Sequence, residues 1–156
     1  MKFLYIIIFF SLISCHSELP KDFTIKVDFD GEIYNSETET LVRYNTLKKN
    51  SIVKIELTKE QKLELYEFYK KIDFLSFPSE FQCDTLKPGG IIPSSSLEIQ
   101  IKANEIIKGS RTNSHCDNKI EMEKEKKLYD FSNKLKKMLE KNPIYKRIPS
   151  SDMIRL

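Results

Sequence analysis

Two cysteines and a histidine are the residues of this chain best suited to chemistry at neutral pH. Cys83 and Cys116 lie in polar stretches, and His115 directly precedes Cys116. A cysteine acts as a nucleophile when a base such as histidine stands beside it. Adjacent residues in a loop rarely face each other, so catalysis would need Cys83 and His115 to meet across two loops. A disulfide between Cys83 and Cys116 would consume both thiols, and we favour it over two unpaired, buried thiols.

Other polar clusters indicate chemistry less clearly. His115-Cys116-Asp117 offers three metal ligands in a row, but contiguous residues do not converge easily on one ion. Ser94-Ser95-Ser96 lacks the Gly-x-Ser-x-Gly turn that presents a serine nucleophile. Gly89-Gly90 lacks the Lys and Ser or Thr of a phosphate-binding loop. These runs are better explained as solvated loops.

Three acids lie close together near the start of the chain. They are Asp28, Asp30 and Glu32, which occupy alternate positions. Alternate positions of a strand share one face, so side chains facing water explain this cluster without a paired-acid site. We therefore expect no catalytic residue, no metal and no cofactor.

The first fifteen residues, MKFLYIIIFFSLISC, carry the most specific pattern. Lys2 gives a positive end, an almost unbroken apolar run of eleven residues follows, and small Ser14 precedes Cys15. These are the parts of a secretory signal peptide. The run is shorter than the roughly 20 apolar residues that a membrane-spanning helix needs. The alternatives are a signal peptide cleaved without lipidation and a buried N-terminal helix.

The ending Leu12-Ile13-Ser14-Cys15 resembles the lipobox of bacterial lipoproteins, which has aliphatic, tolerant, small and cysteine positions in that order. The resemblance covers residues 1–15 alone. It implies that residues 1–14 are removed and that Cys15 receives a diacylglycerol on sulfur and a fatty acyl group, such as palmitate, on its new amino group. Two or three acyl chains anchor a domain stably in a membrane. His16 rather than Asp follows, which favours the outer membrane where the host has one.

Composition limits the classes of partner. The net charge is +3, and loss of Lys2 with the signal peptide would lower it to +2. This balance is too mild for a nucleic-acid footprint, so we expect no nucleic-acid partner.

Residues 15–22 are predicted to be the lipidated cysteine and a tether, and residues 23–156 a single domain. In an exported domain a Cys83–Cys116 bridge would contribute about 3–4 kcal/mol in the chain-entropy model.

Alternating apolar and polar residues predict six strands in two groups. The first group covers residues 23–29, 32–34, 41–44 and 52–57, and its first turn is Asp30-Gly31, a strong hairpin signal. The second group covers residues 97–101 and 106–108, after which residues 111–118 are predicted to be polar loop. Short turns between consecutive strands predict an antiparallel meander.

Each group of strands is followed by a predicted helix. Thr58 to Gln61 forms a capping box, and an apolar stripe comprises Leu65, Phe68, Tyr69 and Ile72. The last helix spans about 119–141 and ends at Asn142-Pro143. The order ββββ-α-ββ-α predicts an α+β fold with one antiparallel sheet covered on one face by two helices.

These patterns indicate a lipid-anchored protein of the bacterial envelope whose domain binds a partner instead of transforming a substrate. The partner would be an envelope protein, which the domain either inhibits, as an immunity-type protein does, or joins as a complex subunit. The alternative is a small envelope enzyme, most simply a hydrolase. A deep cleft containing His115, Cys83 or the acids of residues 28–32 would favour the enzyme, whereas a flat, exposed apolar patch would favour the protein partner.

Overall fold

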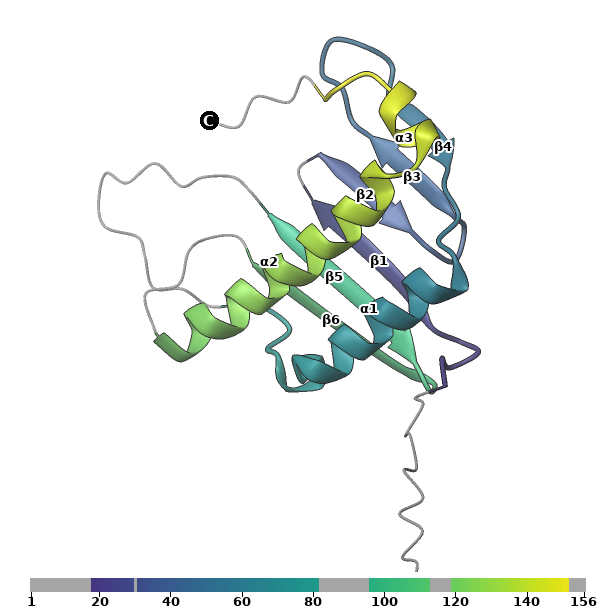
Figure 1. The fold of residues 1–156 in the computed structure, drawn as a ribbon. Helices are drawn as coiled ribbons and strands as arrows, with labels where there is room; N and C mark the ends of the chain where they lie inside the picture. The colour runs from purple at the N-terminus through teal and green to yellow at the C-terminus, as the bar shows by residue number, and fades with distance from the viewer. Residues whose placement is uncertain (1–17, 30, 82–95, 113–118, 152–156) are drawn as a thin grey trace, which may run out of the picture.

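The computed structural model describes residues 18–29, 31–81, 96–112 and 119–151, and their arrangement confirms the predicted α+β fold (Figure 1). Six strands form one antiparallel sheet in the order β4-β3-β2-β1-β5-β6. The strands are β1 (Thr24–Phe29), β2 (Glu32–Asn35), β3 (Thr40–Arg43), β4 (Ser51–Lys54), β5 (Leu97–Ala103) and β6 (Ile106–Thr112). The helices are α1 (Lys59–Lys71), the 3₁₀ turn η1 (Phe74–Ser76), α2 (Lys119–Glu140) and α3 (Pro143–Arg147).

Tight turns set the register of the sheet. Phe29 pairs with Glu32, so two residues join β1 to β2, and Gly31 has a φ of 75°, which glycine adopts without steric cost. The predicted Asp30-Gly31 hairpin is therefore confirmed. Strand β6 runs to Thr112, because residues 97–103 of β5 offer it a partner along its whole length. The prediction that Arg111 and Thr112 begin a loop was wrong.

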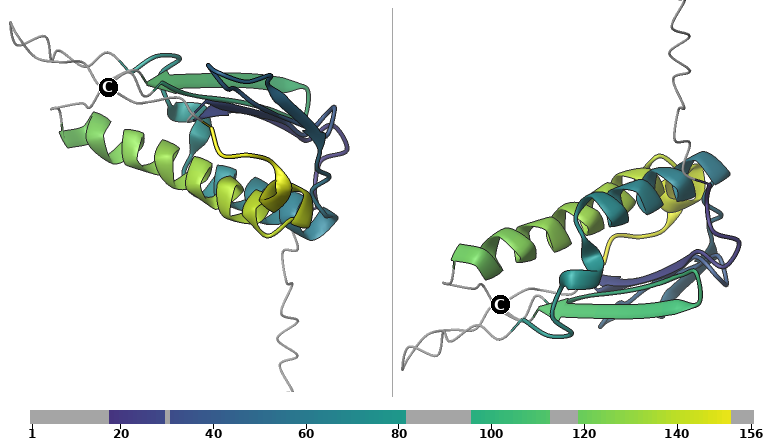
Figure 2. Two further views of the ribbon diagram at one scale, coloured as in Figure 1. Left: turned by 90° about the horizontal axis from the view of Figure 1, so that it is seen from above. Right: turned by 90° about the horizontal axis from the view of Figure 1, so that it is seen from below.

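Both long helices lie on the same face of the sheet (Figure 2). The predicted capping box at the start of α1 is confirmed, since Gln61 N donates to Thr58 Oγ1 at 3.2 Å and Thr58 N donates to Gln61 Oε1 at 2.9 Å. Helix α2 ends at Glu140, and Asn142 caps the N-terminus of α3 by accepting a hydrogen bond from Ile144 N at 2.9 Å. Pro143 then occupies the first turn of α3, where its missing N–H costs nothing. None of the helices in the described part of the chain is long and apolar enough to cross a bilayer.

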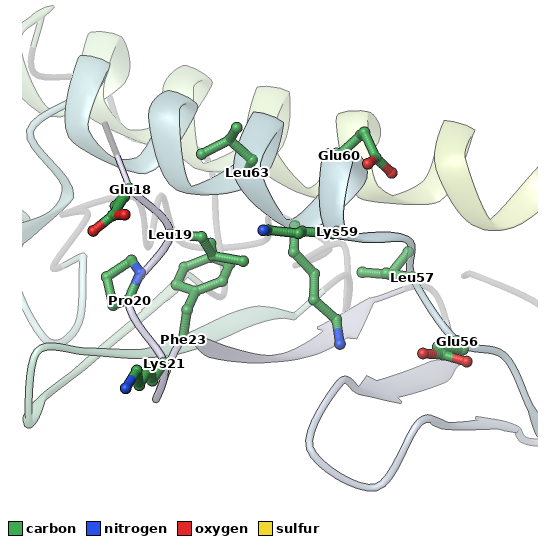
Figure 3. Close-up of a pocket in the computed structure, with 11 residues that line it drawn as sticks. Glu18, Leu19, Pro20, Lys21, Phe23, Glu56, Leu57, Lys59, Glu60 and Leu63 are labelled. Atoms are coloured by element: carbon green, nitrogen blue, oxygen red, sulfur yellow. The ribbon is translucent and has the colours of Figure 1, made fainter. Parts of the chain in front are cut away.

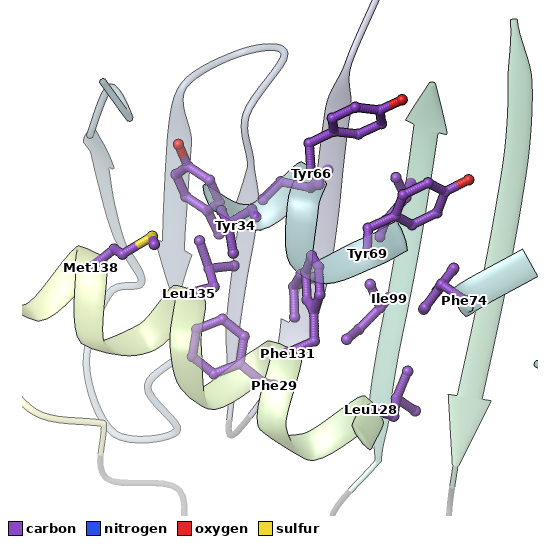
Figure 4. Packing of buried hydrophobic residues seen from close by; sticks show 14 of the residues in the cluster. Phe29, Tyr34, Tyr66, Tyr69, Phe74, Ile99, Leu128, Phe131, Leu135 and Met138 are labelled. Carbon is purple, nitrogen blue, oxygen red and sulfur yellow. The ribbon is translucent and has the colours of Figure 1, made fainter. Parts of the chain in front are cut away.

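The core lies between the helices and one face of the sheet. Leu128, Phe131 and Leu135 of α2 are fully buried against inward side chains of the sheet such as Ile99 (Figure 4). The ring centroids of Phe74, the first residue of η1, and of Phe77, which follows η1, lie 5.3 Å apart within this core. Burial of one face alone explains the strict alternation of apolar and polar residues along β1 and β5.

The packed part of the chain begins before β1. Leu19 packs against the core, and Phe23 N donates to Pro20 O at 3.1 Å in a turn that leads into the sheet. The Asp22 carboxylate accepts hydrogen bonds from the amides of Asn104 at 2.9 Å and Glu105 at 2.7 Å. The segment leading into β1 is therefore fixed to the turn between β5 and β6.

Candidate binding surface

The second face of the sheet has no helix over it in the described part of the chain, and we call it the open face (Figure 2). Strand register aligns six of its side chains in one transverse row, one from each strand. From β6 to β4 this open-face row reads Arg111, Glu98, Asp28, Ile33, Val42 and Ile52. Half of the row is charged and the other half is aliphatic, so the open face combines two kinds of contact side by side.

The aliphatic half of the row is accessible to a partner. Ile33 and Val42 are half-buried, and Ile52 on the edge strand β4 is 68% exposed. Each of these residues lies directly opposite the next across the sheet, so their side chains form a continuous strip. An aliphatic strip on an uncovered sheet face is the kind of surface that a protein partner buries.

The charged half contains two carboxylates in direct cross-strand register. Asp28 lies opposite Glu98, and both line a shallow depression of about 50 Å³ together with Lys26, Ile33 and Gln100. Burial and then the negative charge of Glu98 raise the pKa of Asp28, while Lys26 opposes this shift. Like charges directly opposite each other destabilise a sheet. Arg111 lies opposite Glu98 on its other side and Lys26 acts on Asp28, yet the pKa of Asp28 is still raised, so this pair would gain from a cationic group of a partner.

A second concavity lies at the other side of the sheet, between the segment before β1 and the start of α1 (Figure 3). Its volume is about 760 Å³. Its apolar lining comprises Leu19, Phe23, Leu57 and Leu63. Its charged lining consists of Glu18, Lys21, Glu56, Lys59, Glu60 and Lys62. Acids and lysines are balanced, so this groove does not select a ligand of either charge.

The predicted acidic cluster of residues 28–32 does not form on one solvent face. Asp28 lies on the open face, whereas Glu32 points into the core with only 5% of its surface exposed. The reason is the two-residue turn, which places Glu32 opposite inward-facing Phe29. Asp30 lies outside the described residues. The expectation that these acids all face water was therefore wrong for Glu32.

Glu32 belongs instead to a buried polar cluster that fixes the C-terminal segment. Arg43 Nε donates to Glu32 Oε1 at 2.5 Å, and the Tyr145 hydroxyl donates to Glu32 Oε2 at 3.0 Å. Arg43 Nη1 also donates to the carbonyls of Ile148 at 3.1 Å and Pro149 at 2.8 Å. Burial and the charge of Glu32 raise the pKa of Tyr145 to about 12. These groups satisfy one another, so the cluster is structural.

The sequence analysis did not identify a second buried carboxylate. Glu125 of α2 is 4% exposed and accepts a hydrogen bond from the Thr112 hydroxyl at 2.6 Å. The sequence did contain a signal for this burial. Glu125 precedes Leu128 by three residues and Ser132 by seven, and these spacings place all three on one face of the helix.

The residues to which the sequence assigned sites lie outside the described residues. These are Cys15, Cys83, His115 and Cys116. Within residues 18–29, 31–81, 96–112 and 119–151, no group of three His, Cys, Asp or Glu side chains could hold a metal ion. The site that the described residues do form is the open-face row.

No protein-family model, curated protein or solved structure matches this chain. The function must therefore be argued from the signal-like N-terminus and from the surfaces of the domain.

Proposed function

We propose that this protein is a lipid-anchored binding module of the bacterial cell envelope. Cys15 carries the lipid, and the open face of the sheet binds an envelope protein. The observation that carries the binding proposal is the open-face row, in which Ile33, Val42 and Ile52 form an aliphatic strip next to Asp28 and Glu98.

The open face suits a protein partner better than a small molecule. Pockets for small ligands are concave and enclose most of the ligand, whereas the depression at Asp28 has a volume of only about 50 Å³. A partner that covers the row would bury the aliphatic strip and place a cation beside the two carboxylates. Charge complementarity of this kind speeds encounter and selects the partner.

The role of the complex follows from what the partner does. An inhibitor or immunity-type protein silences an enzyme of the envelope, whereas an accessory subunit supports a larger assembly. The alternative proposal, a small hydrolytic enzyme, would depend on Cys83 and His115. The described residues do not favour the enzyme, because their buried carboxylates take part in structural hydrogen bonds. Glu32 is held by Arg43 and Tyr145. Glu125 accepts a hydrogen bond from Thr112.

Anchoring is tested by the mass of the protein recovered from bacterial membranes. The wild-type chain should begin at Cys15 and carry the mass of a diacylglycerol and an acyl group. Cys15→Ala should accumulate as a larger precursor without added lipid. Recovery of an unlipidated wild-type protein with a cleaved N-terminus from the membrane fraction would contradict the proposal. The location follows from the same anchor: the outer membrane where the host has one, with the domain in the periplasm or at the surface.

A further inference from the structure

The turn between β5 and β6 lies beside the segment through which the chain enters the domain (Figure 1). Asn104 and Glu105 have φ values of 51° and 67°, in the left-handed region that residues other than glycine seldom adopt. The Asp22 carboxylate accepts hydrogen bonds from both of their amides. These bonds lower the pKa of Asp22, so the carboxylate stays charged and holds the turn against the entering chain.

Two aliphatic side chains are exposed directly after this turn. Ile106 is 50% exposed and Ile107 is 63% exposed, although β6 continues with buried Ser110 and Thr112. They belong to the edge strand, Ile106 opposite Ala103 and Ile107 opposite Lys102, so they project from the two faces of the sheet at its corner.

Three lysines belong to the same corner of the domain through the contacts of this turn. Lys21 precedes Asp22, and Lys102 is the cross-strand neighbour of Ile107; both are exposed. Lys70 Nζ of α1 lies over the ring of Tyr66, 4.8 Å from its centroid. Asn104 Nδ2 donates a hydrogen bond to the Tyr66 hydroxyl at 3.5 Å. Glu105 is the one exposed acid of the turn itself. We call this group of Lys21, Lys70, Lys102, Glu105, Ile106 and Ile107 the entry corner.

The entry corner includes Lys21, which is six residues after the proposed anchor at Cys15. Glu18, the first described residue, is three residues after Cys15. An extended chain spans at most about 3.6 Å per residue, so three residues reach about 11 Å. Leu19 and Asp22 are already fixed to the domain. A lipid on Cys15 would therefore hold this end of the domain at the bilayer surface.

We propose that the entry corner rests on the membrane, with Ile106 and Ile107 at the boundary between headgroups and acyl chains and the lysines on anionic phospholipid headgroups. The inference depends on the proposed lipidation of Cys15. Exposed aliphatic side chains flanked by lysines are the combination that binds a lipid surface. Each lysine near an anionic membrane strengthens binding about fivefold. Docking would fix the domain in one orientation, with the edge strand β6 towards the bilayer and the opposite edge strand, β4, away from it.

The sequence contains no tryptophan, so one introduced residue reports its own position by fluorescence. Ile107→Trp places the probe in the entry corner. Ile52→Trp is the matched control, since Ile52 is 68% exposed on β4 at the opposite edge of the sheet. The full-length variants are purified from the membranes of the expressing cells, shown to be folded by circular dichroism, and placed in vesicles of phosphatidylcholine with phosphatidylglycerol. Lipids brominated in the upper acyl chain then quench tryptophan that touches the bilayer.

Docking predicts strong quenching of Ile107→Trp and little quenching of Ile52→Trp. Adding Lys21→Gln and Lys102→Gln should lower the ratio of docked to undocked protein roughly 25-fold and bring the quenching of Ile107→Trp down to the control. Lipidated protein in which both tryptophans are quenched equally, or in which the lysine changes have no effect, would overturn docking alone. A mass spectrum of the same samples without lipid on Cys15 would overturn the proposed anchoring and the docking with it.

Discussion

Asp28 on β1 and Glu98 on β5 lie directly opposite each other on the open face, with aliphatic Ile33 on the other side of Asp28. Burial raises the pKa of Asp28, and repulsion from the Glu98 carboxylate in register raises it further. Repulsion of this kind is expected in a site that is optimised for binding instead of stability, because a bound partner would relieve it.

Replacement of Asp28 by Asn should stabilise the unbound domain. The pKa of Asp28 is raised in the folded state, so the ionised form opposes folding, and this cost appears as the pH rises from the unfolded value through the folded one. At pH 7 we expect Asp28→Asn to raise the free energy of unfolding by about 0.2–1 kcal/mol. Below the unfolded pKa both states are protonated and the gain should vanish. Urea titrations at the two pH values measure this, and an equal gain at both would exclude the electrostatic explanation.

Breaking the buried ion pair of Arg43 and Glu32 should cost more stability than breaking an exposed ion pair. Arg43→Leu leaves the Glu32 carboxylate buried without its partner and should cost about 3–5 kcal/mol. The double replacement Arg43→Leu, Glu32→Leu removes both charges and should recover most of that loss. Arg111→Leu, which breaks an exposed bridge to Glu80 at 2.8 Å, is the control and should change stability far less. A double variant as unstable as the single one would contradict this account.

Neighbouring residues of the 3₁₀ turn should differ in their effect on stability. Phe74 is 1% exposed and packs on Phe77 and Phe131, whereas Leu75 is 47% exposed. Phe74→Ala should destabilise the domain by about 3–5 kcal/mol through loss of burial and the cavity that remains. Leu75→Ala should change it by less than about 0.5 kcal/mol. Thermal and urea unfolding measure both stabilities. Equal stability of the two variants would refute the assignment of Phe74 to the core.

The proposed disulfide is tested by counting thiols. Protein recovered from the envelope and denatured without reductant should show no reactive thiol, because a Cys83–Cys116 bridge would consume two thiols and lipid would block the Cys15 sulfur. Reduction should release two thiols. Replacing both cysteines by serine should cost about 3–4 kcal/mol. Two free thiols before reduction would show that the bridge does not form.

The architecture was predictable from the sequence because local patterns and tertiary packing agree. Alternation along residues 23–29 and 97–101, and the capping box at Thr58, each correspond to an observed element. Helix α3 was missed because Asn142-Pro143 is both a strong helix terminator and a good helix start. The pairing of β1 with β5 follows from contacts distant in sequence, which no local pattern encodes.

The candidate surface was harder to predict than the fold. The open-face row exists only after six strands align, so neither the meeting of Asp28 with Glu98 nor the strip of Ile33, Val42 and Ile52 has a local signature. Glu32 was assigned to water because its neighbours alternate, yet the two-residue turn moves it to the core. Residue type alone could not reveal that Arg43 would be its partner.

The central claim, that the open face binds an envelope protein, is tested most directly by photo-crosslinking in intact cells. A benzoylphenylalanine residue replaces Ile52 in the open-face row or, as the control, exposed Lys137 of α2 on the helical side. We predict a discrete crosslinked species from position 52 that is absent from position 137 and is lost when Asp28→Lys reverses the charge of Asp28 in the same row. Crosslinks of equal yield from both positions, or from position 137 alone, would contradict the claim.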